Sequence, residues 1–170
     1  MKNDLIIDSL DYKQYYKNNL LHRENGPAFE YKTKSGRLSS SWYVDGKLHR
    51  IDGPAVQHAN GDKEWHQNGL LHRVDGPAID RLNVKEWYCN GKLHKEDGPA
   101  STLYTYRNEH DYDFVSYAWV MYYNNGLRHR TDGPALTFFI NGIPHSTYWY
   151  FNNTHVKCKT LDEFKEIISK

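Results

Sequence analysis

Six histidines recur along the chain in one local setting, near the middle of the motif Trp-x-x-x-Gly-x-x-His-Arg-x-Asp-Gly-Pro-Ala or a variant of it. They are His22, His49, His72, His94, His129 and His145. Such a ladder could bind metal ions. However, two strands per repeat at about 4.7–4.9 Å each place equivalent side chains roughly 10 Å apart, whereas the ligands of one zinc ion lie about 2 Å from it. We therefore predict no metal site, and a structural role in which each histidine hydrogen-bonds to the backbone of its own turn.

A basic residue follows most of these histidines and forms a second ladder. Its members are Arg23, Arg50, Arg73, Lys95 and Arg130. Evenly spaced cations suit phosphates, so these five are candidate phosphate ligands. Two residues after the last four of them stand Asp52, Asp75, Asp97 and Asp132. Residues two apart share a face of an extended segment, so we favour a row in which each cation pairs with its own carboxylate. Arg23 is the exception, because Asn25 takes the acidic position.

The motif also begins on a large aromatic residue. Trp42, Trp65 and Trp87 hold this position, and Tyr122 continues the series. One ring per repeat could form a core across a sheet, or a platform on which nucleic-acid bases stack. We favour the core, because aromatic residues make up 15% of the chain while the net charge is only +1. Aromatic side chains suit a pleated, half-buried surface, so we predict an all-β protein whose core is built from rings.

The positions of these residues follow from an internal repeat. Successive motif histidines are separated by 27, 23, 22, 35 and 16 residues, so the basic unit is 22 or 23 residues long. Short strands that run into Asn-Gly indicate hairpins with type I′ turns, and Asp-Gly-Pro then breaks the chain before the next strand. Each repeat is therefore expected to be a hairpin and a return turn. Five to six such repeats would form an array of antiparallel β-hairpins, an extended twisted sheet.

This pattern resembles the MORN repeat family, whose units are hairpins that begin on an aromatic residue and pass through Asn-Gly-x-x-His. The resemblance covers roughly Tyr15 to Thr154, with one extra residue before Asn-Gly and Arg or Lys directly after the histidine, where the family usually has Gly. The form WYxNGxLHRxDGPA is also similar to repeats in uncharacterised proteins of bacteriophages and large DNA viruses. The family implies binding or scaffolding of proteins or phosphoinositide membranes, and no catalytic residue.

The ends of an array need caps, because the outermost hairpins would otherwise expose edges and apolar faces. We expect an N-terminal cap over residues 1–14, whose secondary structure the sequence leaves open between helix and strand. The repeat domain then spans 15–154. A C-terminal capping segment covers 155–170, with a helix over 160–169, because Thr160-Leu161-Asp162-Glu163 is a capping box.

Departures from the period are the best places to look for specificity, because insertions project from the shared scaffold. The longest insertion lies at about 104–114 and is expected to be a loop between two longer strands. It is rich in tyrosine and acidic residues, and tyrosine is frequent in protein-recognition surfaces. Its candidate partner-binding residues are Tyr104, Tyr106, Arg107, Glu109, His110, Asp111, Tyr112 and Asp113. A smaller insertion forms a basic turn, with Lys32, Lys34 and Arg37 as candidate phosphate ligands.

Composition weakens several classes of function. With 22 basic and 21 acidic residues the chain has no global positive field for a polyanion. No apolar run is long enough for a transmembrane segment or a signal peptide. Cys89 and Cys158 fit no metal-ligand pair or disulfide framework. This favours a reduced, cytoplasmic setting, which for a phage or viral protein would be the cytoplasm of the host. No catalytic motif is present, so we predict no enzyme and no cofactor.

Two functions are expected. The first is a non-enzymatic interaction module that binds a protein. In a phage or virus, such a module would inhibit a host factor. The alternative is a binder of nucleotide, nucleic acid or anionic lipid through the repeated Arg and Lys residues and the 32–37 turn. The exposed edges of such an array would also allow a dimer.

Overall fold

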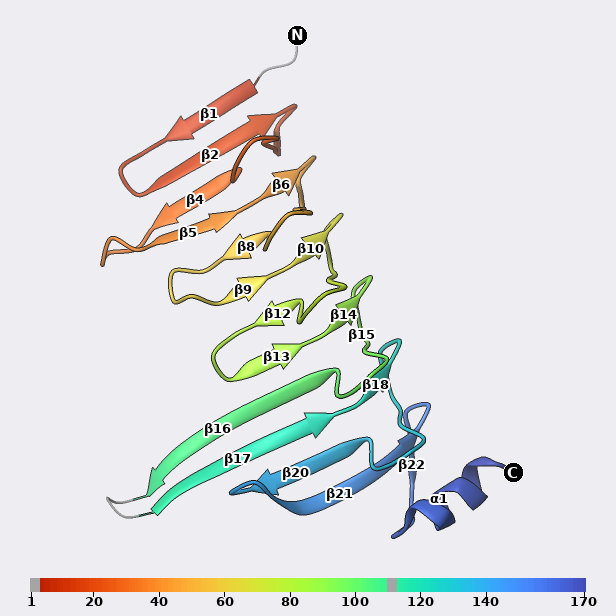
Figure 1. Ribbon diagram of the computed structural model, residues 1–170. Helices are drawn as coiled ribbons and strands as arrows, with labels where there is room; N and C mark the ends of the chain where they lie inside the picture. The colour runs from red at the N-terminus through yellow and green to blue at the C-terminus, as the bar shows by residue number, and fades with distance from the viewer. Residues whose placement is uncertain (1–3, 110–112) are drawn as a thin grey trace. The chain divides into compact units, whose positions relative to one another are not determined.

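The structure is a computed structural model that describes residues 4–109 and 113–170. Among these residues it contains one helix, and the remaining regular structure is antiparallel β-strand (Figure 1). This confirms the predicted all-β fold class of hairpins with a short C-terminal helix. No helix of the described part of the chain is long and apolar enough to cross a membrane. The chain divides into two compact units, Met1–Arg81 and Leu82–Lys170.

In the first unit the main sheet has the strand order β1-β2-β4-β5-β8-β9-β12, and β3 pairs with β2. Two further hairpins, β6–β7 and β10–β11, are separate two-stranded sheets. The strands are β1 (Asp4–Asp8), β2 (Tyr12–Lys17), β3 (Leu20–Leu21), β4 (Phe29–Lys32), β5 (Leu38–Ser41), β6 (Tyr43–Val44), β7 (Lys47–Leu48), β8 (Val56–Gln57), β9 (Lys63–Glu64), β10 (His66–Gln67), β11 (Leu70–Leu71) and β12 (Ile79–Asp80).

In the second unit the main sheet runs β13-β16-β17-β20-β21-β22, and the separate hairpins are β14–β15 and β18–β19. The elements are β13 (Val84–Glu86), β14 (Tyr88–Cys89), β15 (Lys92–Leu93), β16 (Ser101–Glu109), β17 (Asp113–Met121), β18 (Tyr123–Asn124), β19 (Leu127–Arg128), β20 (Leu136–Ile140), β21 (Ile143–Phe151), β22 (Thr154–Val156) and α1 (Leu161–Ile168).

A full repeat contains two hairpins rather than the single hairpin that we predicted. The aromatic residue is the junction between them: the Trp65 N–H donates to the carbonyl of Ala78 in the main sheet, and the Trp65 carbonyl accepts from the His72 N–H in the tight hairpin. The tight turn has type I′ character, with φ of 52° at Asn68 and 84° at Gly69. The second Asn-Gly of the repeat, at Asn60, lies instead in a wider turn that closes when the His58 N–H donates to the Asp62 carbonyl.

The buried centre of each repeat is an alanine, which corrects the prediction of a core made of rings. Five motif alanines are fully buried: Ala28, Ala55, Ala78, Ala100 and Ala135. The motif aromatic residues Tyr15, Trp42, Trp65, Trp87 and Tyr122 are only half-buried. The carbonyl of each alanine accepts a hydrogen bond from the backbone N–H of the motif aromatic residue.

Both ends of the chain contain the expected kind of element. The N-terminal segment forms β1 and β2, in which Ile6 pairs with Tyr15, and β1 is the outermost strand of its sheet. At the other end, Thr160 Oγ1 accepts from the Glu163 N–H, which is the first bond of the predicted capping box. The Glu163 carboxylate accepts from the Lys159 N–H, one residue before the N-cap, in place of the Thr160 N–H. Helix α1 buries Phe164 completely, with its ring 5.0 Å from that of Trp149.

Candidate functional site

The loop that leads from each motif histidine to the Gly-Pro pair, here called the return loop, holds its cation in a fixed place. In the third repeat the guanidinium carbon of Arg73 lies 3.9 Å from the centre of the Trp65 ring. Its Nε donates to Asp75 Oδ1 at 2.9 Å and its Nη1 donates to the Pro77 carbonyl at 3.2 Å. The side chain is thus bound by a ring face, a carboxylate and a backbone oxygen.

Gly76 completes this arrangement by its lack of a side chain. A Cβ atom at Gly76 would lie 2.7 Å from the guanidinium carbon of Arg73, which is closer than real Cβ contacts come. The glycine is therefore required by the close approach of the guanidinium. The same contact occurs at Gly53, where a Cβ would lie 3.0 Å from Arg50, and at Gly133, where it would lie 2.9 Å from Arg130.

Three repeats share the complete set of contacts, and we call their loops the regular return loops. In the second, Arg50 lies 4.1 Å from the Trp42 ring and its Nε donates to Asp52 at 2.9 Å. In the fifth, Arg130 lies 3.9 Å from the Tyr122 ring and its Nε donates to Asp132 at 2.7 Å. Three of the four ion pairs expected from the sequence are therefore present, and the pair expected between Lys95 and Asp97 is not formed among the described residues. As candidate phosphate ligands, Arg50, Arg73 and Arg130 already have a carboxylate and a ring as partners.

The carboxylates of the regular return loops are affected in turn by their arginines. The hydrogen bond from Arg73, together with its charge, holds the pKa of Asp75 below its usual range. The pKa of Asp52 is lowered in the same way by Arg50, and that of Asp132 by Arg130. The aspartates are nevertheless exposed to solvent, with 83% of the Asp52 side chain and 82% of the Asp75 side chain accessible.

Four motif histidines, His22, His49, His94 and His129, bind the backbone of the following repeat and not that of their own turn, so the prediction is wrong for these four. His49 Nδ1 accepts from the backbone N–H of Asn68, which lies in the tight turn of the following repeat, at 3.1 Å. The contact recurs between the next pairs: Asp45 N–H to His22 in the first unit, and Asn125 N–H to His94 and Asn152 N–H to His129 in the second. The histidines therefore join consecutive repeats within each unit.

Two return loops depart from the regular set. In the first, Arg23 lies over Tyr15 at 3.9 Å and donates to the Pro27 carbonyl, but Asn25 provides no carboxylate. In the fourth, Lys95 Nζ lies 3.9 Å from the Trp87 ring centre. Among the described residues Lys95 forms no ion pair with Asp97 or any other carboxylate. The cation keeps its place over the ring in both loops.

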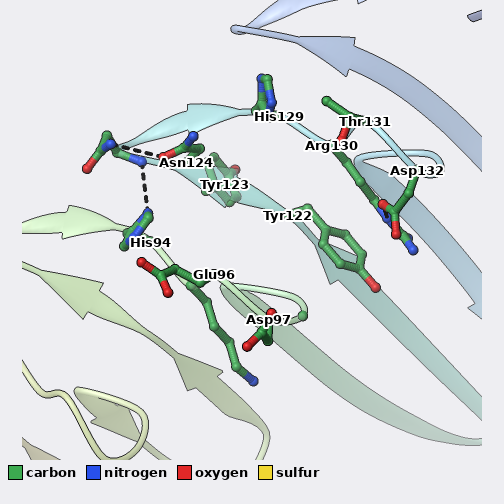
Figure 2. A pocket seen from close by; sticks show the side chains of 13 residues that line it. His94, Glu96, Asp97, Tyr122, Tyr123, Asn124, His129, Arg130, Thr131 and Asp132 are labelled. Atoms are coloured by element: carbon green, nitrogen blue, oxygen red, sulfur yellow. Dashed lines mark hydrogen bonds and ion pairs between the residues drawn. The ribbon is translucent and has the colours of Figure 1, made fainter. Parts of the chain in front are cut away.

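Between consecutive return loops lie open grooves. The groove in Figure 2 has a volume of about 770 Å³ and belongs to the second unit. Glu96 and Asp97 reach it from the fourth return loop, and Tyr122, Arg130 and Asp132 from the fifth repeat. A corresponding groove of about 460 Å³ in the first unit lies between Arg50 and Val74 of the second and third return loops.

Apolar side chains stand at the middle position of two return loops in the first unit. Ile51 is 80% exposed and Val74 is 88% exposed, and each precedes one of the exposed aspartates. We call Ile51, Asp52, Val74 and Asp75 the return-loop surface. Its exposed groups are apolar and acidic, while the arginines of the same loops are turned onto their rings.

The predicted insertion is mostly strand rather than loop. Residues 104–109 lie in β16 and residues 113–114 in β17, and the pairing extends as far as Glu109 opposite Asp113. Alternation of aromatic and β-branched residues with polar ones explains this extension. Tyr104 is 41% exposed and Tyr106 is 57% exposed. Arg107, Glu109 and Asp113 are placed here by their backbone alone, and the candidates His110, Asp111 and Tyr112 lie outside the described residues.

The basic turn connects β4 to β5 as predicted. Thr33 organises it, because its hydroxyl accepts from the Arg37 N–H at 3.0 Å and its N–H donates to the Arg37 carbonyl. Lys32, Lys34 and Arg37 are all exposed. Within the described part of the chain, none of the three forms an ion pair.

One polar cluster was missed in the sequence. Glu64 accepts a hydrogen bond from Arg81 at 2.9 Å, and the Nε2 atoms of His58 and His66 each lie 3.2 Å from its carboxylate. Burial would raise the pKa of Glu64, but the contacts with His66, Arg81 and His58 outweigh it and lower the pKa. Only the spacing of Glu64 and His66, two residues apart in the sequence, could have indicated it. The structure places them at the end of β9 and the start of β10. The described residues contain no cluster of three groups able to hold a metal ion.

Comparison with models of protein families finds no match for this chain, and comparison with curated proteins finds none either.

Proposed function

We propose that the chain is a non-enzymatic β-repeat module that binds a protein partner. The observation that carries this proposal is the character of the return-loop surface. Ile51 and Val74 are almost fully exposed, next to the exposed carboxylates of Asp52 and Asp75. The arginines that could attract a polyanion are bound to those carboxylates and to ring faces.

The energetics favour a protein as the partner of this surface. Complete burial of a Val or Ile side chain is worth about 1.5–3 kcal/mol, and a protein interface can supply apolar atoms to bury them. Phosphate groups would gain nothing from these side chains and would be repelled by the carboxylates. The matching partner surface combines apolar residues with Lys or Arg, which would complement Asp52 and Asp75.

The test compares protein capture by the wild type and two variants. Ile51→Ser combined with Val74→Ser removes the apolar part of the return-loop surface. Leu10→Ser is the matched control, because Leu10 is 94% exposed in the same unit but lies in the turn between β1 and β2. Quantitative mass spectrometry of captured proteins should show a partner retained by the wild type and the control and lost by the double variant. Equal capture by all three, or capture abolished by nuclease, would contradict the proposal.

The insertion provides a second contact for the same partner. Tyr104 and Tyr106 are exposed on β16, and tyrosine supplies a large contact area at low entropic cost. Tyr104→Ser combined with Tyr106→Ser should weaken capture of the partner found above. Full retention would remove the insertion from the interface. A phage or viral origin and inhibition of a host factor stay predictions of the sequence resemblance.

A second candidate function is supported by the basic turn alone. Three exposed cations without ion pairs among the described residues could bind phosphates of nucleic acid or anionic lipid. Each phosphate contact contributes about 0.7–0.9 to the dependence of log affinity on log salt concentration. Replacing Lys32, Lys34 and Arg37 by Ala should therefore lower the slope for single-stranded DNA by about two. If the wild type does not bind DNA or anionic vesicles at low salt, this function is excluded.

A further inference from the structure

The first return loop differs from the regular loops at the acidic position, where Asn25 replaces Asp. The rest of the arrangement is intact. Arg23 Nη1 donates to the Pro27 carbonyl at 3.1 Å and the guanidinium carbon lies 3.9 Å from the Tyr15 ring centre. A Cβ on Gly26 would lie 3.0 Å from that carbon, as at the regular loops. The guanidinium of Arg23 therefore lies against the same three groups as that of Arg73: a ring, a proline carbonyl and a glycine.

In the regular loops, an arginine held by these three groups also binds a carboxylate through its Nε–H. Those loops bind Nε to Asp Oδ1 at 2.7–2.9 Å. No described carboxylate lies within ion-pair distance of Arg23, and the Asn25 amide forms no hydrogen bond with it. The adjacent acid, Glu24, lies instead 3.5 Å from Lys17 Nζ and 3.7 Å from His22 Nε2. Arg23 is thus the motif arginine that forms no ion pair with a carboxylate among the described residues.

Arg23 lines a groove of about 450 Å³ that has an apolar wall. In the groove between the second and third return loops, one wall is the return loop around Ile51. At the first repeat β1 takes that place, and Leu5 and Ile6 line the groove together with Tyr15 and Arg23. Leu5 is 51% exposed and Ile6 is 60% exposed. An unmatched guanidinium therefore shares a groove with two aliphatic side chains. Lys17 and Glu24 line the same groove, where they pair with each other.

We propose that this groove binds a carboxylate group carried by a ligand with an apolar substituent. The Nε and Nη2 edge of Arg23 would take the carboxylate side-on with two hydrogen bonds, which is the strongest geometry for this pair. The substituent would cover Leu5 and Ile6. The ligand is either a free carboxylic acid or the C-terminal carboxylate of a peptide. This site is separate from the return-loop surface, so it stands or falls independently of the proposed function.

The test follows the Nε–Hε signal of Arg23 by NMR in the isotopically labelled full chain. The probes are 4-methylpentanoate, the peptide Gly-Ser-Gly-Val-Leu with a free carboxylate, and the same peptide amidated. We expect saturable shifts with the free carboxylates and none with the amide. Asn25→Asp restores the internal carboxylate and should weaken binding by about tenfold or more, since a hydrogen bond between charged groups is worth about 1.5–3 kcal/mol.

A reciprocal variant provides the matched control. Asp75→Asn removes the carboxylate of a regular loop. The Nε–Hε signal of Arg73 should then shift with the same probes, whereas in the wild type we expect no shift of this signal. Asn25→Asp introduces the residue of the regular loops and should fold at least as stably as the wild type. A response to the peptide alone supports the proposal and assigns the carboxylate to a chain terminus, and a response to 4-methylpentanoate alone supports it and assigns the carboxylate to a free acid. A response to both supports the proposal and shows that a carboxylate with an apolar substituent is sufficient. No response of Arg23, equal binding of the amide, or undiminished binding by Asn25→Asp would overturn the proposal.

Discussion

The regular return loops and the two divergent ones share the position of the cation and differ in its neutralisation. Arg73 has a ring, a carbonyl, a glycine and a carboxylate around it, whereas Arg23 lacks the carboxylate and Lys95 lacks the guanidinium geometry. Both divergent cations still lie 3.9 Å from their ring centres. The difference indicates that the aromatic ring positions the cation, while the aspartate only neutralises it. The close approach to the glycine is confined to the arginines, because a Cβ at Gly98 would lie 3.5 Å from Lys95 Nζ.

The largest effect is expected when the ring is removed. Trp65→Ala takes away the surface on which Arg73 lies and the contacts of a half-buried indole, so the free energy of unfolding should fall by about 3 kcal/mol. Trp65→Tyr keeps a ring of the kind found at Tyr15 and Tyr122 and should cost about 1 kcal/mol. Urea denaturation measures both. If the two variants are equally destabilised, the ring does not position the cation.

The next effect comes from filling the space at Gly76. Gly76→Ala places a methyl group 2.7 Å from the guanidinium carbon of Arg73. The flexible end of the arginine must shift and lose part of its contacts, at a cost of about 1 kcal/mol. In an Arg73→Ala background the same substitution should cost less than about 0.5 kcal/mol, because the clash is gone. An equal cost in the two backgrounds would show that Gly76 is required for some other reason.

An effect of similar size is expected from exchange of the cation types. Arg73→Lys keeps a charge over Trp65 but loses the hydrogen bonds to Asp75 and Pro77, which should cost about 1 kcal/mol. Lys95→Arg should create in the fourth loop the bond to Asp97 that the regular loops have, and raise stability slightly. Thermal unfolding of the two variants provides the comparison. Unchanged stability of Arg73→Lys would mean that the ring contact alone is sufficient.

The smallest effect is the dependence of stability on pH. Hydrogen bonds from Arg50, Arg73 and Arg130 lower the pKa of their aspartates in the folded state. Between that lowered pKa and the usual value of about 4, the unfolded chain binds more protons than the folded chain. The stabilisation of the folded chain by these three pairs is therefore complete above the usual aspartate pKa. It is lost as the pH falls through the lowered pKa of the folded state. Urea unfolding between pH 7 and 2 should show Asp75→Asn losing less stability on acidification than the wild type; an identical loss would contradict the pairing.

The repeat made part of this structure predictable. Asn68-Gly69 must form a tight turn, because both residues tolerate positive φ, and the spacing of Arg73 and Asp75 places them on one side of an extended segment. The capping box at Thr160 located the helix for a similar reason, since its bonds connect neighbours in sequence. Each of these predictions depended on contacts within a few residues.

Contacts between repeats were not predictable in the same way. His49 could bind the tight turn of its own repeat or that of the next repeat. Because the repeats have nearly the same sequence, the spacing of residues does not distinguish the two arrangements, and the structure shows the second. The buried role of Ala78 depends on how closely two backbones approach, and the Glu64 cluster joins residues up to 17 positions apart. The position of Arg23 beside Leu5 required the pairing of β1 with β2.

The most direct test of the positioning role of the aromatic ring is the mobility of the Arg73 Nε atom. Its ¹⁵N heteronuclear NOE reports motion on the picosecond-to-nanosecond timescale. We expect a value typical of rigid structure in the wild type, nearly the same value in Asp75→Asn, and a large fall in Trp65→Ala. A rigid Nε in Trp65→Ala together with a mobile one in Asp75→Asn would show that the carboxylate, not the ring, holds the cation in place.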